Sequence, residues 1–257
     1  MENKHNLVVR LATAGDKPYA ETITNEMEES AKARGTGIAK RSPEYIEKKM
    51  EEGKAVIALT RDGVWVGFCY IEAWQHEKYV ANSGLIVAPA FRKTGVATDI
   101  KRKVFELSRE KYPHAKIFGL TTGLAVMKIN SDLGYEPVTY SELTTDEEFW
   151  KGCKSCINYD ILTAKNRKNC LCTAMLFDPA EAEAKLKEAE EREKAKQMVV
   201  TPQGDLVTHR HRDFKRNISL FERWMRLKQF VMLGRKRGGD GENQGRKKSI
   251  FSFFFFW

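Results

Sequence analysis

The chain contains no run of apolar residues that approaches the ~18 needed for a membrane-spanning helix. Its first ten residues, MENKHNLVVR, offer neither the apolar core nor the small-residue cleavage site of a secretory signal. From these two features we expect neither a transmembrane protein nor a Sec-type exported protein. We therefore expect a cytoplasmic protein without a membrane span.

Cysteine is also scarce. Five cysteines in 257 residues, an odd number, argue against a scaffold held together by disulfides. A charge excess is missing from most of the chain as well. The net charge is +9, but thirteen Lys or Arg and five Asp or Glu follow residue 204, so residues 1–204 carry only +1. The high isoelectric point belongs to the C-terminal stretch, and we do not expect the main body to bind nucleic acid.

Hydrophobic residues make up 42% of the chain, enough for a substantial core. Periodicity and turn residues predict a regular order of strands and helices. The expected strands are residues 6–11, 55–60, 64–73, 80–88, 117–121 and 135–140. The expected helices are residues 17–33, 42–52, 96–107 and 125–133. This order predicts an α/β fold, with a mixed sheet flanked by helices.

The composition changes after residue 140 and divides the chain into four parts. Residues 1–140 form the expected main domain, and residues 141–178 form a segment that contains four cysteines. Residues 179–233 are expected to form a charged helix at 179–197, a small hairpin at 198–207 and a basic helix at 213–233. Residues 234–257, which end in SFFFFW, are expected to be disordered. The oligomeric state is left open.

The strongest local motif is VAPAFRKTGVA at residues 87–97, between an expected strand and an amphipathic helix. The N-terminus of a helix offers unpaired N–H groups and a partial positive charge to an anion. Gly95 allows a positive φ and a close backbone approach, while Arg92 and Lys93 add charge and Ala97 leaves room. The same pattern also suits an ordinary strand–loop–helix connection with exposed basic residues.

The pattern V-x-P-x-x-R-x-x-G-x-A resembles the acetyl-coenzyme A signature of the GNAT superfamily of N-acetyltransferases. That signature usually reads R/Q-x-x-G-x-G/A, which the chain matches at Arg92, Gly95 and Ala97. The segment LGYEP at residues 133–137 is similar to the "LGF-E" segment that ends the family's fold. The resemblance covers residues 6–140. It implies a GNAT-like sheet that is splayed at its centre.

The resemblance also implies a reaction in which a primary amine attacks the thioester of acetyl-CoA, the co-substrate. The coenzyme diphosphate would lie on backbone N–H groups of Arg92, Lys93, Thr94, Gly95, Val96 and Ala97. The pantetheine arm would run beside Leu85, Ile86 and Val87, where a backbone N–H polarises the carbonyl group. Glu72 is the candidate base that leads the amine proton away. The tyrosine that many members use as an acid is replaced here by Asn130.

The stretch LTTGLA at residues 120–125 is similar to the L-T-T-x-x-A stretch of N-acetylglutamate synthase-type enzymes of arginine biosynthesis. A dicarboxylate amino acid needs cations, and Arg34, Lys40 and Arg41 lie in the loop expected to overhang the acceptor. The expected small-molecule substrate is therefore a free amino acid, with glutamate first. Two alternatives stay open: a protein or peptide N-acetyltransferase, and a non-catalytic CoA-binding regulatory module.

Cys153, Cys156, Cys170 and Cys172 form two close pairs within twenty residues. Four thiolates suit a tetrahedral zinc ion, so we expect one structural zinc that holds this segment to the main domain. Two other interpretations remain: cysteines buried in a pair of strands at residues 159–165 and 171–177, and a redox C-x-x-C. Cys69, on an expected strand, is assigned to the core.

Overall fold

The computed structural model describes residues 7–35 and 40–197. These residues belong to the first of two units, Met1–Thr208, and the second unit, His209–Trp257, lies outside the described residues. The predicted hairpin at 198–207, basic helix at 213–233 and tail at 234–257 also lie outside them. No helix within the described ranges is long and apolar enough to cross a membrane.

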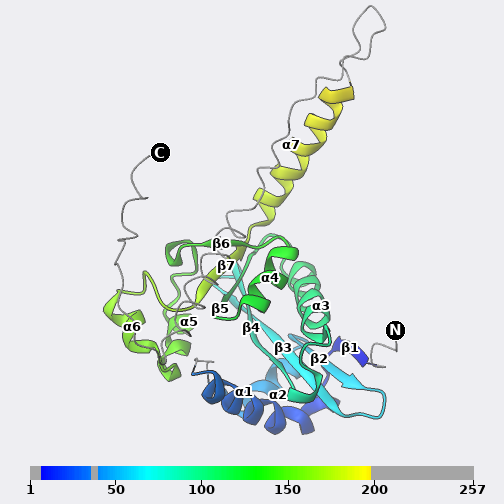
Figure 1. The fold of residues 1–257 in the computed structure, drawn as a ribbon, viewed down its shortest axis with the longest axis vertical. Helices are drawn as coiled ribbons and strands as arrows, with labels where there is room; N and C mark the ends of the chain where they lie inside the picture. Colours follow the sequence, from blue (N-terminus) through cyan, green and yellow to red (C-terminus); the bar gives the residue numbers. More distant parts are fainter. Residues whose placement is uncertain (1–6, 36–39, 198–257) are drawn as a thin grey trace, which may run out of the picture. The chain divides into compact units, whose positions relative to one another are not determined.

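Seven strands form one mixed sheet in the order β1-β2-β3-β4-β5-β7-β6 (Figure 1). The strands are β1 Leu7–Leu11, β2 Ala55–Thr60, β3 Trp65–Trp74, β4 Tyr79–Val87, β5 Lys116–Thr121, β6 Glu136–Val138 and β7 Thr173–Phe177. The helices are α1 Ala20–Arg34, α2 Pro43–Glu51, α3 Val96–Lys111, α4 Leu124–Asp132, α5 Glu147–Lys151, α6 Tyr159–Ala164 and α7 Pro179–Gln197. The predicted mixed α/β class is confirmed.

The strands begin and end where the local residues dictate. The turn Arg61–Asp62–Gly63 joins β2 to β3, and Gly63 adopts the left-handed φ of 84° that favours glycine. Helix α2 begins at Pro43, the preferred first helical residue, and the Ser42 side chain accepts a hydrogen bond from Tyr45 N. These local signals explain why the order of elements was readable from the sequence.

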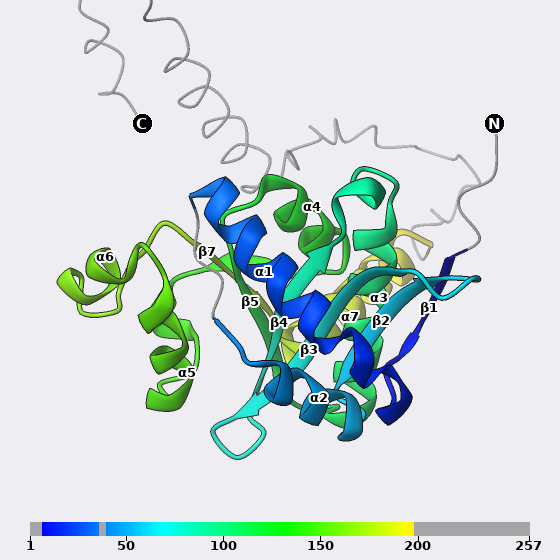
Figure 2. The same cartoon turned by 90° about the horizontal axis from the view of Figure 1, so that it is seen from below.

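Helices cover both faces of the sheet (Figure 2). Helices α1 and α2 pack on one face, against Ile57, Phe68 and Tyr70 among others. Helix α3 packs on the opposite face and buries Ile100 and Val104 completely. Each such aliphatic side chain contributes about 1.5–3 kcal/mol when it leaves water. The helices are therefore held in place by apolar stripes that the sequence shows at helical spacing.

The sheet does not end at residue 140. Strand β7 lies between β5 and β6 and pairs antiparallel with both, so the segment 141–178 supplies an internal strand. Residues 159–165, considered as a strand in one interpretation of the cysteines, begin with helix α6 instead. Helix α7 covers the predicted charged helix at 179–197. Its described side chains are mostly exposed, in keeping with charge on all sides.

The predicted zinc site is not supported. No group of three or more His, Cys, Asp or Glu side chains in the described ranges is placed to hold a metal ion, and all four cysteines of the segment are described. Cys153, Cys170 and Cys172 instead pack against an apolar cluster that contains Tyr140 and Trp150. Burial raises the pKa of the Cys153 thiol to about 11. Cys153, Cys170 and Cys172 therefore act as packing groups, which is closer to the buried-cysteine interpretation, although residues 159–164 form a helix and not a strand.

Candidate active site

The sheet splays between its two parallel strands. Strand β4 pairs with β5 only from Tyr79 to Ala81, opposite Lys116 to Phe118. Beyond that point β4 continues against β3, and β5 continues against β7. The result is a wedge that opens between the carboxyl-terminal halves of β4 and β5 (Figure 2). This is the splay that the family resemblance implied.

A β-bulge lies on the β4 side of the wedge. Phe68 pairs with Ile86 and Tyr70 with Ser83, so Gly84 and Leu85 both stand opposite the single β3 residue between them. Gly84 has a φ of 67°, and a Cβ there would lie 2.4 Å from the Tyr70 ring and 2.9 Å from Met27. Only glycine fits this position. A bulge leaves one residue outside the ladder, so a backbone N–H becomes available beside the wedge.

The loop between β4 and α3 has the shape of an anion site. Lys93 and Gly95 adopt positive φ values of 66° and 96°, and α3 begins at Val96. The first helical bond runs from Thr98 N to Gly95 O at 2.9 Å, so the N–H groups of Val96 and Ala97 precede it. Within the described part of the chain, a Cβ on Gly95 would meet no atom closer than 4 Å. The loop therefore offers backbone donors to open space.

Arg92, however, turns away from that space. Its Nε donates to Val87 O at 3.1 Å, and one terminal nitrogen lies 2.6 Å from both Glu26 and Ser30 on α1. The side chain therefore joins the loop to α1, and the Arg92 N–H donates to Pro89 O at 3.3 Å, so donors for a phosphate must come from later residues of the loop. Lys93 makes no ion pair with a described residue, so its charge stays available at the rim.

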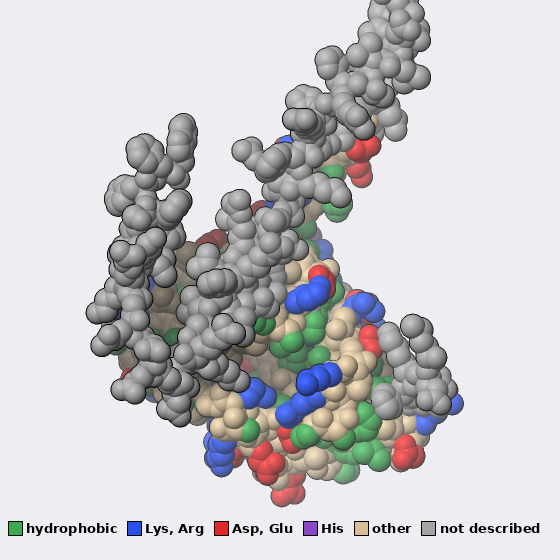
Figure 3. Space-filling view, viewed as in Figure 1, with side chains coloured by type: hydrophobic (Ala, Val, Ile, Leu, Met, Phe, Trp, Pro, Cys, Tyr) green, Lys and Arg blue, Asp and Glu red, His purple; other side chains and the backbone are tan. Residues whose placement is uncertain are grey.

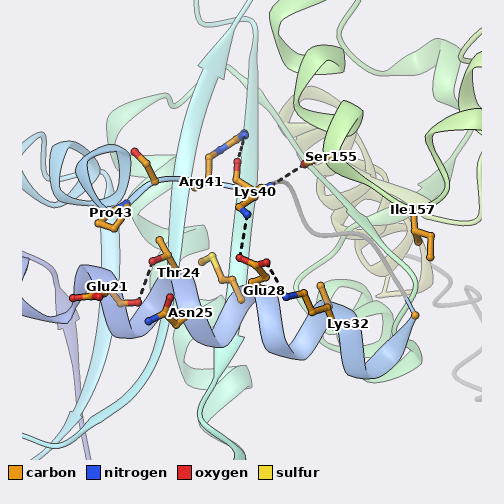
Figure 4. A pocket seen from close by; sticks show the side chains of 14 residues that line it. Glu21, Thr24, Asn25, Glu28, Lys32, Lys40, Arg41, Pro43, Ser155 and Ile157 are labelled. Atoms are coloured by element: carbon orange, nitrogen blue, oxygen red, sulfur yellow. Dashed lines mark hydrogen bonds and ion pairs between the residues drawn. The ribbon is translucent and has the colours of Figure 1, made fainter.

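A cavity of about 530 Å³ lies on the α1 face of the sheet (Figure 4). Helix α1 supplies one wall, the segment Lys40 to Pro43 a second, and Ser155 with Ile157 a third. Met27 lines the cavity and also touches the position of Gly84, so the cavity lies directly beside the β4 bulge. Volumes of this size are typical of small-molecule sites.

The lining carries charges of both signs. The charged residues are Glu21, Glu28, Lys32, Lys40 and Arg41. Glu28 pairs with Lys32 at 2.9 Å and with Lys40 at 3.3 Å, while the Lys40 N–H donates to Ser155 Oγ at 2.9 Å. The last contact joins the cysteine-containing segment to the cavity wall. The sequence held no signal for the roles of Ser155 and Ile157.

Behind the cavity, Glu72 and Arg41 form a buried cluster with Tyr45, Lys49 and Tyr70. Arg41 Nε donates to the Tyr70 hydroxyl at 3.1 Å, and its NH2 lies 3.7 Å from Glu72. Lys49 lies 3.5 Å from Glu72, and the Tyr45 hydroxyl donates to the same carboxylate. Burial raises the pKa of Glu72, and Arg41 opposes this. Tyr45 and Lys49, one helical turn apart, were missed in the sequence because their shared partner lies on β3.

The predicted substrate residues separate into two places. Lys40 and Arg41 line the cavity, but Arg34 does not. Burial and the nearby Arg92 guanidinium lower the pKa of Arg34, which places Arg34 near the loop before α3. Glu72 does not line the cavity either, and Arg41 touches both. In the visible part of the surface, Lys, Arg, Asp and Glu side chains are interspersed (Figure 3).

Comparison with known proteins gives one family and several structural likenesses. N-acetylglutamate synthase from Neisseria gonorrhoeae, solved with coenzyme A and N-acetyl-glutamate, is 19% identical over 67% of this chain, with a TM-score of 0.49. This chain spans 35% of that protein. Rv2747 from Mycobacterium tuberculosis is 18% identical over 66% of this chain and 98% of its own, with a TM-score of 0.48.

A phosphinothricin acetyltransferase from Sinorhizobium meliloti is 15% identical over 67% of this chain and 88% of its own, with a TM-score of 0.46. No curated protein sequence matches significantly. The family model described as "Acetyltransferase (GNAT) family" matches residues 24–125. That range contains most of α1, the β4 bulge and the whole loop before α3. Residues 24–125 therefore match an acetyltransferase domain of the GNAT family.

Proposed function

We propose that the protein moves an acetyl group from acetyl-CoA to the α-amino group of a free amino acid, with glutamate as the first candidate. The observation that carries the proposal is the cavity of about 530 Å³, lined by charges of both signs and placed beside the β4 bulge. A zwitterionic amino acid needs both an acidic and a basic neighbour. The resemblance of residues 120–125 to N-acetylglutamate synthase-type enzymes supports the same substrate class.

The loop before α3 suits the diphosphate of the co-substrate. The N–H groups of Val96 and Ala97 precede the first hydrogen bond of α3, at the positive end of the helix dipole, and a Cβ on the adjacent Gly95 would meet no atom of the described residues within 4 Å. Residues Leu85 to Val87 then border the wedge that would hold the pantetheine arm. When acetyl-CoA is bound, it supplies the activated acyl group. A backbone N–H of the bulge would polarise the acyl carbonyl without any side-chain rearrangement.

The cationic side chains of the cavity would recognise the acceptor. Arg41 is held by Tyr70 and Glu72 and lies over the Tyr45 ring at 4.8 Å, so its guanidinium has a fixed orientation. A guanidinium held in a fixed orientation binds a carboxylate with little further loss of side-chain conformational entropy. Glu21, on the opposite wall, carries the charge that attracts an ammonium group. With the substrate carboxylate held at Arg41, the α-amine would lose its proton on the side of the cavity next to the β4 bulge.

The geometry changes the role we assign to Glu72. Glu72 does not line the cavity, whereas Arg41 lines it and also contacts Glu72. The Glu72 carboxylate would therefore act on the acceptor only through another group. The Tyr45 hydroxyl, bonded to Glu72, is one such group, and water is another. Glu72 is therefore proposed first as a positioning residue for Arg41, and its service as a base requires a relay.

A coenzyme-release assay across free amino acids, polyamines and peptides tests the proposal. We expect turnover with glutamate to exceed turnover with an uncharged amino acid, and peptides to be poor acceptors. Turnover with a peptide N-terminus or a lysine, but not with glutamate, would assign the protein to the peptide-modifying class. Binding of acetyl-CoA without turnover on any amine would instead indicate a regulatory module.

Arg41→Ala tests the contact with the substrate. Loss of a charge-assisted hydrogen bond of roughly 1.5–3 kcal/mol should raise KM for glutamate about tenfold to hundredfold. KM for an uncharged amine should change little, because that amine never used the guanidinium. Arg61→Ala, in the exposed turn between β2 and β3, is the matched control. An equal rise for both acceptors would remove the carboxylate contact from the proposal.

A further inference from the structure

Lys101 is a lysine in the core of the domain. It lies on α3 and is 2% exposed, among Ile100, Val104 and other buried residues. Its ammonium lies 5.3 Å from the centre of the Tyr135 ring. Lysine is among the residues least often fully buried without a charged partner. A position on the apolar stripe of a core helix would ordinarily hold an aliphatic side chain, so this lysine calls for an explanation.

The ammonium is attached to one residue of the sheet. Lys101 Nζ donates to Asn82 Oδ1 at 3.1 Å, and the Tyr135 hydroxyl donates to the same oxygen at 2.9 Å. Asn82 Nδ2 donates to Ser108 Oγ at 2.9 Å, and Ser108 donates onward to Val104 O at 2.7 Å. Every polar atom of the Asn82 side chain is therefore in use, and its orientation is fixed.

Asn82 marks the apex of the wedge. The last paired residues of β4 and β5 are Ala81 and Phe118, and Asn82 is the next residue along β4. The strands are still close at this level, because a Cβ on Gly119 would lie 3.6 Å from Asn82 O. The Asn82 side chain points to the α3 face, where Lys101 and Ser108 contact it. The ammonium thus lies at the closed end of the wedge.

The same helix links this ammonium to the anion loop. Lys101 lies five residues beyond Val96, the first residue of α3. At 1.5 Å per residue, that is roughly 7–8 Å along the helix axis. An extended ligand held by its diphosphate at the helix N-terminus, with its arm between β4 and β5, runs towards Lys101. Its thioester end would lie towards the apex.

The charge of Lys101 has no compensating carboxylate. No Asp or Glu oxygen of the described residues lies within 4 Å of its nitrogen. The groups that face it are Asn82 on β4, Tyr135 after α4, and the buried Cys69 thiol on β3. Burial lowers the pKa of Lys101, and burial raises the pKa of Cys69 to about 11. An ammonium donates three hydrogen bonds, and protein oxygen takes one of them here.

We propose that Lys101 is a positioning and electrostatic residue of the acetyl transfer, whose buried ammonium at the apex of the wedge stabilises the coenzyme A thiolate as it departs. This rests on the proposed function, since it requires the pantetheine arm to occupy the wedge. As the amine nitrogen bonds to the acetyl carbon, the carbon–sulfur bond breaks and its electron pair stays on sulfur. The amine then loses a proton, and the thiolate gains one, to give free coenzyme A. Lys101 keeps its own proton throughout.

Asn130 on α4 is 1% exposed and has no ionisable proton, and its Oδ1 has no hydrogen-bond partner among the described residues. An uncompensated charge interacts more strongly with a neighbouring charge in a site without water than it does in water. The cost of burying it is accepted at sites where charge develops during a reaction.

The test measures the pKa of the thiol of bound coenzyme A. The ultraviolet absorbance of the thiolate is followed against pH for the coenzyme A complex, and the same titration with desulfo-coenzyme A subtracts the protein's own thiols. Wild-type protein is compared with Lys101→Met, which keeps the length of the side chain and removes its charge. Lys103→Met, a half-exposed position on the same helix, is the control.

We expect the bound thiol to titrate below free coenzyme A in the wild type and in Lys103→Met. In Lys101→Met its thiolate fraction at a given pH should fall about tenfold or more, equivalent to one pKa unit. A wild-type midpoint at or above that of free coenzyme A overturns the proposal, whether or not the variant folds. So does a midpoint that Lys101→Met leaves unchanged. Calorimetry distinguishes a failure of this proposal from a failure of the proposed function. If the wild-type protein does not bind coenzyme A, the proposed function itself is refuted.

Discussion

Arg92 and Glu26 form an ion pair at 2.6 Å that joins the loop before α3 to helix α1. The same guanidinium also lies 2.6 Å from Ser30, one helical turn further along α1. A motif arginine that appears in the sequence to serve a phosphate is thus a structural clamp between its loop and α1. The clamp also fixes α1, which forms a wall of the cavity.

Arg92→Ala should therefore weaken the fold more than it weakens coenzyme binding. It removes contacts to Val87 O, Glu26 and Ser30 from a half-exposed side chain, a loss of about 1–2 kcal/mol in the free energy of unfolding. The affinity for coenzyme A should fall only a few-fold. Urea unfolding and calorimetry measure the two quantities, with Arg102→Ala on the exposed face of α3 as control. Unchanged stability with a hundredfold loss of affinity would indicate that the Arg92 guanidinium binds a phosphate of the coenzyme.

Gly95→Val should abolish coenzyme binding while the fold survives. The φ of 96° costs a β-branched residue about 1–3 kcal/mol, and the new side chain would occupy the open space in front of the loop. Gly63→Val is the matched control, because its φ of 84° imposes similar strain in a turn that joins β2 to β3. Calorimetric titration with coenzyme A should show loss in the first variant alone. Equal affinity in both would rule out the loop as the diphosphate site.

Glu72 should give the protein a measurable dependence of stability on pH. Burial raises the pKa of Glu72 in the folded state, so the native protein holds a proton that the unfolded chain releases. The contribution is fully present below the unfolded pKa, about 4.3, and is lost as pH rises through the folded pKa. Glu72→Gln should remove this slope, and urea unfolding at a series of pH values measures it.

Glu110→Gln, at an exposed position near the end of α3, serves as the control for that titration. It should reproduce the wild-type slope. If Glu72→Gln does so as well, the carboxylate is not protonated preferentially in the native state. The influence of Arg41 on the pKa would then outweigh that of burial.

Lys101→Met should raise the stability of the protein while it slows the reaction. The substitution removes a buried charge that has no carboxylate partner, and Asn82 Oδ1 keeps the Tyr135 hydroxyl as donor. We expect a gain on the order of 1 kcal/mol in the free energy of unfolding near neutral pH. The gain should shrink as pH rises, because the wild-type lysine then loses its proton in both states. Thermal unfolding near pH 7 and at higher pH measures this change. A loss of stability in Lys101→Met would instead indicate that the ammonium serves only the fold.

The local sequence determined the order of the elements up to β6. Apolar periodicity, the Asp62–Gly63 turn and the Ser42–Pro43 helix start depend only on neighbouring residues, and the structure agrees with each. The loop before α3 was recognisable for the same reason. Its glycine, basic residues and helix start lie within eleven consecutive positions.

The tertiary structure alone decided what lies beside what. Strand β7 enters the sheet between β5 and β6 from beyond residue 140, and the cysteines pack in an apolar cluster instead of forming the expected zinc site. Arg92 faces α1, Arg41 meets Glu72 and Tyr70, and Lys101 meets Asn82. Each of these contacts joins residues far apart in the chain. Sequence spacing carries no information about such pairs, because their distance is set by how the helices pack on the two faces of the sheet.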